Sequence, residues 1–310
     1  MDEGFVLVIG SAGINIKGRP EDECIWGQSN LGYIRNSVGG VARNIAENLA
    51  RLEVETVLLT ALGADLEGER VLQVCRDAGI NCDYVRRVEG VQTGVYMALM
   101  KADGELEVAL SDFEVMKAVD ADYLLEHESL FAQAAIVVID ATLSSEALHA
   151  LFDLCDRYHV RVCGDPTTPT LASRFCEFLP QFYLLAPNAS ETHALCGLDV
   201  TAVDRDTATA AARQLVTIGV DIAAVTMGER GLAYAYRGGS GFIRARKTEV
   251  VDTTGAGDAF TGAVIFGLLN EVEIDEAMRL GVTAASLTLE SRETVLPYLS
   301  QELLYDELAV

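Results

Sequence analysis

Short apolar runs alternate with amphipathic helical stretches along most of this 310-residue chain. The runs have the length of strands that are buried on both faces, whereas the stretch 41–52 places Val41, Ile45 and Leu49 on one helical face. Alternating strands and helices form parallel βαβ units, because parallel strands need a crossover between them. The sequence therefore predicts an α/β fold, in which a central, mostly parallel sheet carries helices on both faces.

The same patterns predict where the elements lie. Strands are expected at Phe5–Ile9, Thr56–Leu62, Ala135–Asp140, Val160–Gly164, Phe182–Ala186, Ile222–Met227 and Leu232–Tyr236. Helices are expected at Val41–Leu52, Leu66–Gly79, Ser145–Tyr158, Asp204–Gly219 and Asp258–Asn270. In such sheets ligands bind beyond the carboxyl ends of the strands, so we expect the functional site at that edge.

Two segments interrupt the alternation. Residues 15–38 are polar and strand-prone, and residues 93–112 have the pattern of a hairpin with its turn at Ala102–Glu105. Both adjoin expected strand ends, so they predict a small β-lid inserted in a single domain that spans residues 1–310. An exposed lid sheet also invites pairing between two copies of the chain, which would form a homodimer.

The chain is strongly acidic, with a formal net charge of −24. This charge argues against nucleic acid and anionic membranes as partners, because both require basic surface. It leaves room for a small anionic ligand, which helix dipoles and a bound metal can hold. No apolar run reaches the ~18–20 residues of a membrane span. The acidic start also lacks the basic flank of a secretory signal, so we expect a cytoplasmic protein.

The seven cysteines and four histidines show no pattern of a metal or disulfide site. No Cys-x-x-Cys pair is present, so ordinary buried, reduced thiols are expected. The histidines lack metal-binding spacing, and no permanent zinc or iron site is predicted.

The stretch 252–260, Asp-Thr-Thr-Gly-Ala-Gly-Asp-Ala-Phe, carries the clearest chemistry. It follows a strand-prone run at Thr248–Val251 and leads into an apolar helix. The first amides of a helix have no intrahelical acceptors and the helix dipole is positive there, so a glycine-rich helix start can bind phosphate. Residues 255–257 are placed to do so, and Asp258 is placed to accept a proton from an attacking hydroxyl.

A lone Gly-x-Gly before an aspartate would fit a simple helix start with an aspartate cap. The nine-residue string is more specific, and it resembles the C-terminal signature of the ribokinase family, the PfkB-type sugar and nucleoside kinases. Four more segments resemble elements of that family in order and spacing: Gly10–Asn15, Ser37–Asn44, Pro187–Glu191 and Thr226–Gly231. The resemblance implies a ribokinase-like fold with a β-lid and ATP-dependent phosphorylation of a hydroxyl group.

The resemblance also implies a role for each matching residue. The catalytic set is Asp258, as general base, with Gly255, Ala256 and Gly257. Substrate contacts fall to Asn15, Lys17, Gly39, Gly40, Asn44 and Asp112. ATP contacts fall to Asn188, Thr226, Gly228, Gly231 and Thr254. Glu191 would organise Mg²⁺ through water, and Asp252 with its loop would hold K⁺.

Simpler structural roles stay open for several residues. They are a tight turn for Gly39, Gly40, Gly228 and Gly231, a cap or turn for Asp140, Asp165, Glu191 and Asp252, and a solvated surface position for Lys17.

The N-terminal third most resembles pseudouridine kinases and related nucleoside kinases of that family. The matching stretches are Asn15–Pro20, Gln28–Gly32 and Gly39–Leu49, and Asp112 stands where the subgroup has a lid aspartate. Asn15 departs from the family, which usually has aspartate there. An amide offers one accepting oxygen and a donating NH₂, so sugar recognition is either weaker or tuned to another substrate.

The residues expected around the acceptor favour a neutral molecule. Asn15, Asn30 and Asn44 offer amides that donate and accept, as a nucleobase edge requires. The nearby cations are Lys17, Arg19, Arg35 and Arg43. Lys17 and Arg43 could serve an anionic or carbonyl-rich group, but a sugar phosphate would need a cluster of cations around its phosphate. We expect a nucleoside such as pseudouridine, ahead of a free sugar, phosphorylated on its primary hydroxyl.

The alternative is a non-catalytic sugar- or nucleotide-binding sensor on a kinase fold. The intact Asp258 weighs against it, since a decayed enzyme tends to lose its base. A dehydrogenase fits less well, because no Gly-x-Gly-x-x-Gly follows the first strand. Release of ADP with candidate substrates separates the enzyme from the sensor.

Overall fold

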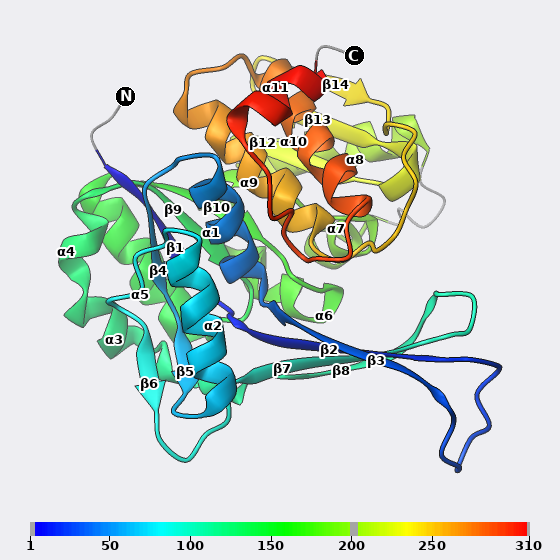
Figure 1. Ribbon diagram of the computed structural model, residues 1–310. Helices are drawn as coiled ribbons and strands as arrows, with labels where there is room; N and C mark the ends of the chain where they lie inside the picture. Colours follow the sequence, from blue (N-terminus) through cyan, green and yellow to red (C-terminus); the bar gives the residue numbers. More distant parts are fainter. Residues whose placement is uncertain (1–3, 199–203, 309–310) are drawn as a thin grey trace.

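The computed structural model describes residues 4–198 and 204–308, and Figure 1 labels its elements. The strands are β1 (Phe5–Ile9), β2 (Gly13–Pro20), β3 (Gly32–Gly39), β4 (Thr56–Leu59), β5 (Ala61–Gly63), β6 (Arg86–Val88), β7 (Gly94–Met100), β8 (Leu106–Asp112), β9 (Ala134–Asp140), β10 (Arg161–Asp165), β11 (Phe182–Leu185), β12 (Ile222–Thr226), β13 (Leu232–Tyr236) and β14 (Gly239–Ile243). The helices are α1 (Val41–Arg51), α2 (Leu66–Asp77), α3 (Ala121–Glu126), α4 (Glu128–Phe131), α5 (Ser145–Tyr158), α6 (Pro169–Ala172), α7 (Ala189–Cys196), α8 (Arg205–Ile218), α9 (Ala256–Leu269), α10 (Ile274–Leu289) and α11 (Gln301–Leu308). Short 3-10 helices are η1 (Glu114–Ala118), η2 (Ser173–Gln181) and η3 (Gly228–Arg230). None of the helices in these ranges is both long and apolar enough to cross a membrane.

An eight-stranded sheet forms the centre of the molecule, in the order β14-β13-β12-β11-β10-β9-β1-β4. Neighbours from β12 to β4 are parallel, and β13 and β14 extend the sheet as an antiparallel edge. Val6 and Val8 of β1 belong to a core shared with α1, α9 and α10, while Leu7 and Ile9 belong to a core shared with α5 and α8. The expected α/β architecture, with a packed core on each face of the sheet, is confirmed.

The strands and helices expected from the sequence lie close to their expected positions, with two differences, whereas α10, α11 and β14 were not expected. The expected strand Thr56–Leu62 is divided, because β5 leaves the central sheet to pair with β6. The strand-prone run Thr248–Val251 forms no strand. The backbone N–H groups of Val251 and Asp252 instead donate to Leu289 O, at 2.8 and 3.3 Å, and so satisfy a carbonyl at the end of α10.

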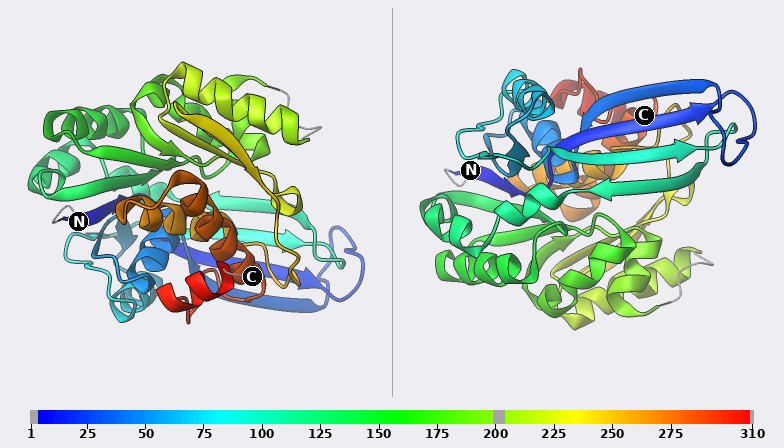
Figure 2. Two further views of the ribbon diagram at one scale, coloured as in Figure 1. Left: turned by 90° about the horizontal axis from the view of Figure 1, so that it is seen from above. Right: turned by 90° about the horizontal axis from the view of Figure 1, so that it is seen from below.

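A second sheet of four strands is built mainly from the two segments that interrupt the alternation, and it begins at Gly13 and includes Gly39, slightly beyond the expected 15–38. Its order is β3-β2-β7-β8. β2 pairs antiparallel with β3 and parallel with β7, and β7 pairs antiparallel with β8. Figures 1 and 2 show this four-stranded sheet projecting from the body of the molecule.

The buried guanidinium of Arg43 fixes the start of α1. Its Nη1 donates to Glu47 on the same helix, and its Nη2 donates to Val38 O at 2.9 Å and to Thr294 Oγ1 at 3.0 Å. The residue is 1% exposed, so the expectation that Arg43 could serve an anionic ligand is wrong. It instead joins α1 to β3 and to the segment that follows α10.

Replacing Arg43 with methionine (Arg43→Met) should lower the free energy of unfolding by about 3 kcal/mol, because Glu47 would lose its buried partner and keep only Arg51. Arg35 pairs with Glu293 on the surface and is the matched control, for which Arg35→Met should cost less than about 1 kcal/mol. Urea denaturation measures both variants. Equal losses would contradict a structural role for Arg43.

Candidate active site

A cavity of about 770 Å³ lies where the carboxyl edge of the central sheet faces the four-stranded sheet. Its lining includes Ser11, Thr142 and Thr167 from the loops after β1, β9 and β10, Asn15 and Tyr96 from the four-stranded sheet, and Asn44, Thr254, Gly255 and Asp258 from the first turn of α1 and the start of α9. Residues from both ends of the chain therefore meet at the edge where parallel sheets bind ligands.

Asp258, in the first turn of α9, is a buried carboxyl that lines this cavity. One of its oxygens accepts a hydrogen bond from Asn44 Nδ2 at 2.6 Å. Burial raises the pKa of Asp258 to about 7. The Asn44 hydrogen bond and the Arg43 charge oppose this shift, while the carboxylates of Asp140 and Glu191 add to it. A carboxyl that titrates near neutral pH suits proton transfer.

No side chain caps the start of α9. Gly255 precedes the helix with a φ of 86°, and a Cβ at this position would lie 1.8 Å from Thr294 O, so glycine is required. An added Cβ at Gly257 would meet no described atom within 4 Å, which indicates open space beside this turn. The amides of Gly255, Ala256 and Gly257 are thus available to an anion.

The first backbone amides of α1 already donate to acceptors within the protein. Ser11 Oγ accepts from Val41 N at 3.0 Å, and Asp140 Oδ2 accepts from Ala42 N at 3.2 Å. Asp140 Oδ2 also accepts from the backbone N and the Oγ of Ser11, at 2.7 and 2.6 Å. Asp140, which ends β9, is therefore a structural residue that joins β1, β9 and α1.

Three of the residues expected to contact the acceptor, Asn15, Gly40 and Asn44, line the cavity. Gly39 packs against Asn15, since a Cβ on Gly39 would lie 2.3 Å from Asn15 Oδ1. The absence of a side chain at residue 39 therefore leaves room for the Asn15 amide.

Asp112 is not among the residues that line the cavity. Its carboxylate accepts from Gln92 Nε2 at 3.0 Å and from Glu114 N at 3.1 Å, at the start of η1. In this conformation Asp112 closes the turn after β8.

Lys17 also lies outside the cavity lining, where it bridges two distant segments. Its Nζ lies 2.7 Å from both carboxylate oxygens of Asp252 and donates to Thr254 Oγ1. Burial acts to raise the pKa of Asp252, but the bonds from Lys17 and from the Thr254 amide outweigh it and lower this pKa. The carboxylate expected to hold K⁺ is thus already paired with an ammonium group, and the site does not fit a further monovalent cation.

A smaller hollow of about 230 Å³ follows the ends of β11 and β12. It is lined by Asn188, Ala189, Ser190, Thr226, Met227, Gly228 and Arg230. Three residues expected to contact ATP, Asn188, Thr226 and Gly228, therefore lie together. Gly231 is not among the residues that line the hollow. It ends a tight turn, in which its carbonyl accepts from Met227 N at 2.9 Å.

Glu191 caps the helix that borders this hollow. Its Oε2 accepts from Asn188 N at 2.8 Å, while Asn188 Oδ1 accepts from Glu191 N at 3.0 Å, which forms a capping box at the start of α7. Glu191 therefore has the capping role that the sequence left open. The cap uses Oε2, so the other carboxylate oxygen can still face a ligand.

Three buried acids lie close enough for their charges to interact: Asp165, Glu191 and Asp258. Burial raises the pKa of Asp165 well above its usual range, and the charges of Asp258 and Glu191 add to this shift. Burial likewise raises the pKa of Glu191, although the Asn188 bonds oppose it. Within residues 4–198 and 204–308, no three His, Cys, Asp or Glu side chains form a complete metal site. A divalent cation beside these acids would need further oxygen ligands from water or phosphate.

The sequence reasoning missed part of the cavity wall. Tyr96, Leu106 and Phe113 give the wall an apolar surface on the side of the four-stranded sheet. Arg174 also lines the cavity, and its Nη1 donates to the carbonyls of residues 141, 142 and 143, at 3.1, 3.1 and 3.0 Å. The aromatic and aliphatic residues of the hairpin at 93–112 were the available signal for this wall.

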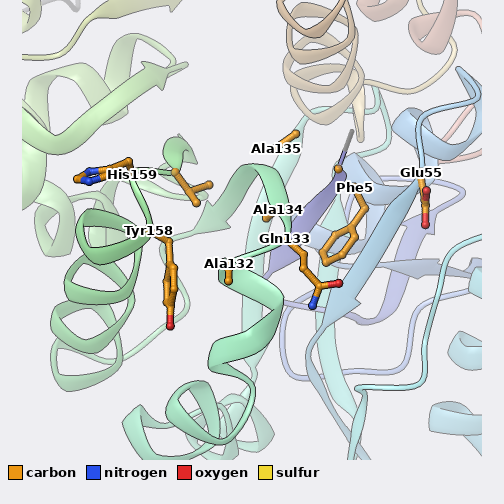
Figure 3. Close-up of a pocket in the computed structure, with 10 residues that line it drawn as sticks. Phe5, Glu55, Ala132, Gln133, Ala134, Ala135, Tyr158 and His159 are labelled. Carbon is orange, nitrogen blue, oxygen red and sulfur yellow. The ribbon is translucent and has the colours of Figure 1, made fainter. Parts of the chain in front are cut away.

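A separate cavity of about 510 Å³ lies at the amino edge of the central sheet (Figure 3). Phe5 and Ala134 line it from the starts of β1 and β9, together with Glu55, Tyr158 and His159. It contains none of the expected site residues and faces away from the carboxyl strand ends, so it is not the candidate active site.

Comparison with known proteins agrees with this geometry. Residues 4–301 match the model of the pfkB family of carbohydrate kinases. The chain belongs to this kinase family. Pseudouridine kinase from Escherichia coli (strain K12) is 31% identical over 300 residues, which are 96% of this chain and 95% of that protein. Guanosine-inosine kinase from Exiguobacterium acetylicum is 32% identical over 295 residues, which are 93% of this chain and 95% of that protein.

Solved structures share the fold of this pfkB-family chain. The structure of Arabidopsis thaliana ribokinase complexed with ribose and ATP matches it with a TM-score of 0.86 at 23% identity, covering 99% of both chains. This match confirms the ribokinase-like fold. The family match and the two nucleoside kinases confirm the enzyme class, a sugar or nucleoside kinase.

The rate of this pfkB-family kinase should depend on the charge of Asp258. Because a base must be deprotonated, kcat/KM should fall as the pH drops below about 7. Asn44→Ala removes a hydrogen bond that favours the charged carboxylate, so the acidic limb should move to higher pH. Asn48→Ala is the control, since Asn48 donates to Asn44 O one turn away. If the acidic limb of the kcat/KM–pH profile lies at the same pH in Asn44→Ala as in wild type, a group other than Asp258 controls it.

Proposed function

We propose that the protein transfers the γ-phosphate of ATP to the primary hydroxyl of a nucleoside such as pseudouridine, with Asp258 as general base. One observation carries this proposal. A buried carboxyl with a pKa of about 7 lies beside uncapped helix amides, in a cavity bordered by the four-stranded sheet. The arrangement offers a proton acceptor and an anion site next to each other, as phosphoryl transfer requires.

The nucleotide would bind in the smaller hollow, with its phosphates directed toward the larger cavity. Asn188, Thr226 and Gly228 would hold the nucleotide, with Gly231 shaping their turn and Thr254 near the phosphates. The structure of Arabidopsis thaliana ribokinase, which has the same fold, is described as complexed with ribose and ATP. That complex supports ATP as the phosphate donor here.

The phosphoryl group would meet the amides of Gly255, Ala256 and Gly257, which stabilise its charge. Asp258 would take the proton of the acceptor hydroxyl as that oxygen attacks the γ-phosphorus and the bond to ADP breaks. Mg²⁺ bound with the nucleotide would neutralise charge on the β- and γ-phosphates. Glu191 would orient it through water, and the neighbouring Asp165 is a further candidate, because hard cations prefer oxygen ligands.

Charge in and around the cavity favours a neutral acceptor. Lys17 and Arg43 bind other protein groups, Arg19 donates to Ala102 O, and Arg35 pairs with Glu293. Of the described residues that line the cavity, Arg174 is the one cation, and its Nη1 already donates to three carbonyls. A phosphate on the acceptor would lack the cluster of cations that usually binds it.

Shape favours a nucleoside over a free pentose. A ribose ring alone would fill only part of a cavity of about 770 Å³. Tyr96, Leu106 and Phe113 supply an apolar wall on which a base could stack, while Asn15 and Asn44 supply amides for polar edges. The two nucleoside kinases that are 31% and 32% identical to this chain support the same substrate class.

The four-stranded sheet would act as a lid. Its side chains Asn15 and Tyr96 reach the cavity from outside the central sheet, so closure would exclude water from the transferring phosphate. Its outer strands also expose large apolar side chains, with Ile34 of β3 82% exposed and Leu110 of β8 69% exposed. We propose that two copies pair through this surface. Sedimentation velocity should then show a dimer that Ile34→Glu weakens, and a monomeric wild type would contradict the pairing.

The proposed reaction is tested by an ADP-release screen over nucleosides, free sugars and sugar phosphates. The nucleosides should be turned over best, and Asp258→Asn should lower kcat by ~10² to 10⁴ while ATP still binds. Fructose phosphates turned over far better than any nucleoside or free sugar would contradict the acceptor class. Ligand binding without ADP release in any mixture would instead indicate a non-catalytic sensor.

Glu191→Gln tests the metal assignment. Glutamine can keep the reciprocal cap with Asn188 but removes the negative charge, so the Mg²⁺ concentration for half-maximal rate should rise several-fold. Glu146→Gln, in the exposed first turn of α5, is a suitable control. A Mg²⁺ titration identical to wild type would remove Glu191 from the metal site.

A further inference from the structure

The ammonium group of Lys17 links the four-stranded sheet to the loop that leads into α9. Lys17 lies on β2, and Asp252 and Thr254 lie more than 230 residues later in the chain. The side chains are mostly shielded, with 19% of Lys17 and 26% of Asp252 exposed. This contact therefore joins two parts of the protein that the central sheet alone does not hold together.

Every N–H donor of the Lys17 ammonium group has an acceptor in this contact. An ammonium group has three N–H donors, and acceptors for all three are present: Asp252 Oδ1, Asp252 Oδ2 and Thr254 Oγ1. Asp252 Oδ1 also accepts from Thr254 N at 2.9 Å, which closes the loop on itself. Gly255 follows directly and begins the turn whose amides face the phosphate site. Any shift of the loop would therefore displace those amides.

We infer that Lys17 is a positioning residue whose Nζ takes the place of a bound monovalent cation beside the anion-binding turn. When the four-stranded sheet closes, β2 brings its own positive charge to Asp252 and Thr254 and fixes the loop. The turn would then be held in place by the contact with β2, and K⁺ in solution would be dispensable. The kinetic part of this inference rests on the proposed phosphoryl transfer, whereas the structural part does not.

Two substitutions of Lys17 separate charge from volume. Lys17→Ala leaves a cavity beside Asp252 that K⁺ or NH₄⁺ can enter, while Lys17→Met fills that space without charge. Wild-type kcat should be the same in potassium and in tetramethylammonium chloride. Both variants should lose at least about 10-fold in kcat, with a smaller change in KM for ATP, and K⁺ should restore only Lys17→Ala. Lys101→Met, which breaks an exposed ion pair with Glu105 in the turn between β7 and β8, should behave as wild type.

Amide hydrogen exchange and thermal unfolding give readouts that need no turnover. Exchange in residues 250–260 should be faster in both Lys17 variants than in wild type, and K⁺ should slow it and raise the unfolding temperature only in Lys17→Ala. A wild type that requires K⁺, or variants with unchanged exchange in this loop, would overturn the inference. If no acceptor is phosphorylated but exchange changes as expected, the contact stands and the proposed function fails.

Discussion

The carboxylate of Asp140 is the interaction on which the geometry of the site depends. It binds the backbone and hydroxyl of Ser11 at the end of β1 and the amide of Ala42 at the start of α1, and it also binds Thr142 beyond β9. These bonds hold the first turn of α1 against the carboxyl edge of the sheet. Asn44 lies one turn along that helix, and only in this position can its amide reach Asp258 on α9.

The two helices that begin at this cavity, α1 and α9, present different groups to it. The amides of α1 are consumed by Ser11 and Asp140, so this helix contributes side chains to the site. The start of α9 has no side-chain cap and is held by a glycine pressed against Thr294, so it contributes bare amides. Burial then keeps the neighbouring Asp258 near neutral pKa, where a carboxyl can both lose and regain a proton during turnover.

Sequence reasoning predicted the sheet, its main helices and the family because these depend on local periodicity and on contiguous motifs. The resemblance to the family also grouped Asn15, Asn44 and Asp258 in one site, and all three line the cavity. It could not predict that Lys17 pairs with Asp252, because that contact depends on how the four-stranded sheet folds over a loop more than 230 residues away. For the same reason Arg43, interpreted as a possible ligand-binding cation, proved to be buried against Glu47 and Thr294.

The central claim is that Asp258 is a buried carboxyl whose pKa lies near neutrality before any ligand binds. Carboxyl ¹³C NMR of protein labelled at aspartate tests it directly, with the Asp258 signal assigned by its loss in Asp258→Asn. The account predicts a titration midpoint at about pH 7 in the free protein. A midpoint near the ordinary aspartate value of about 3.9 would contradict it.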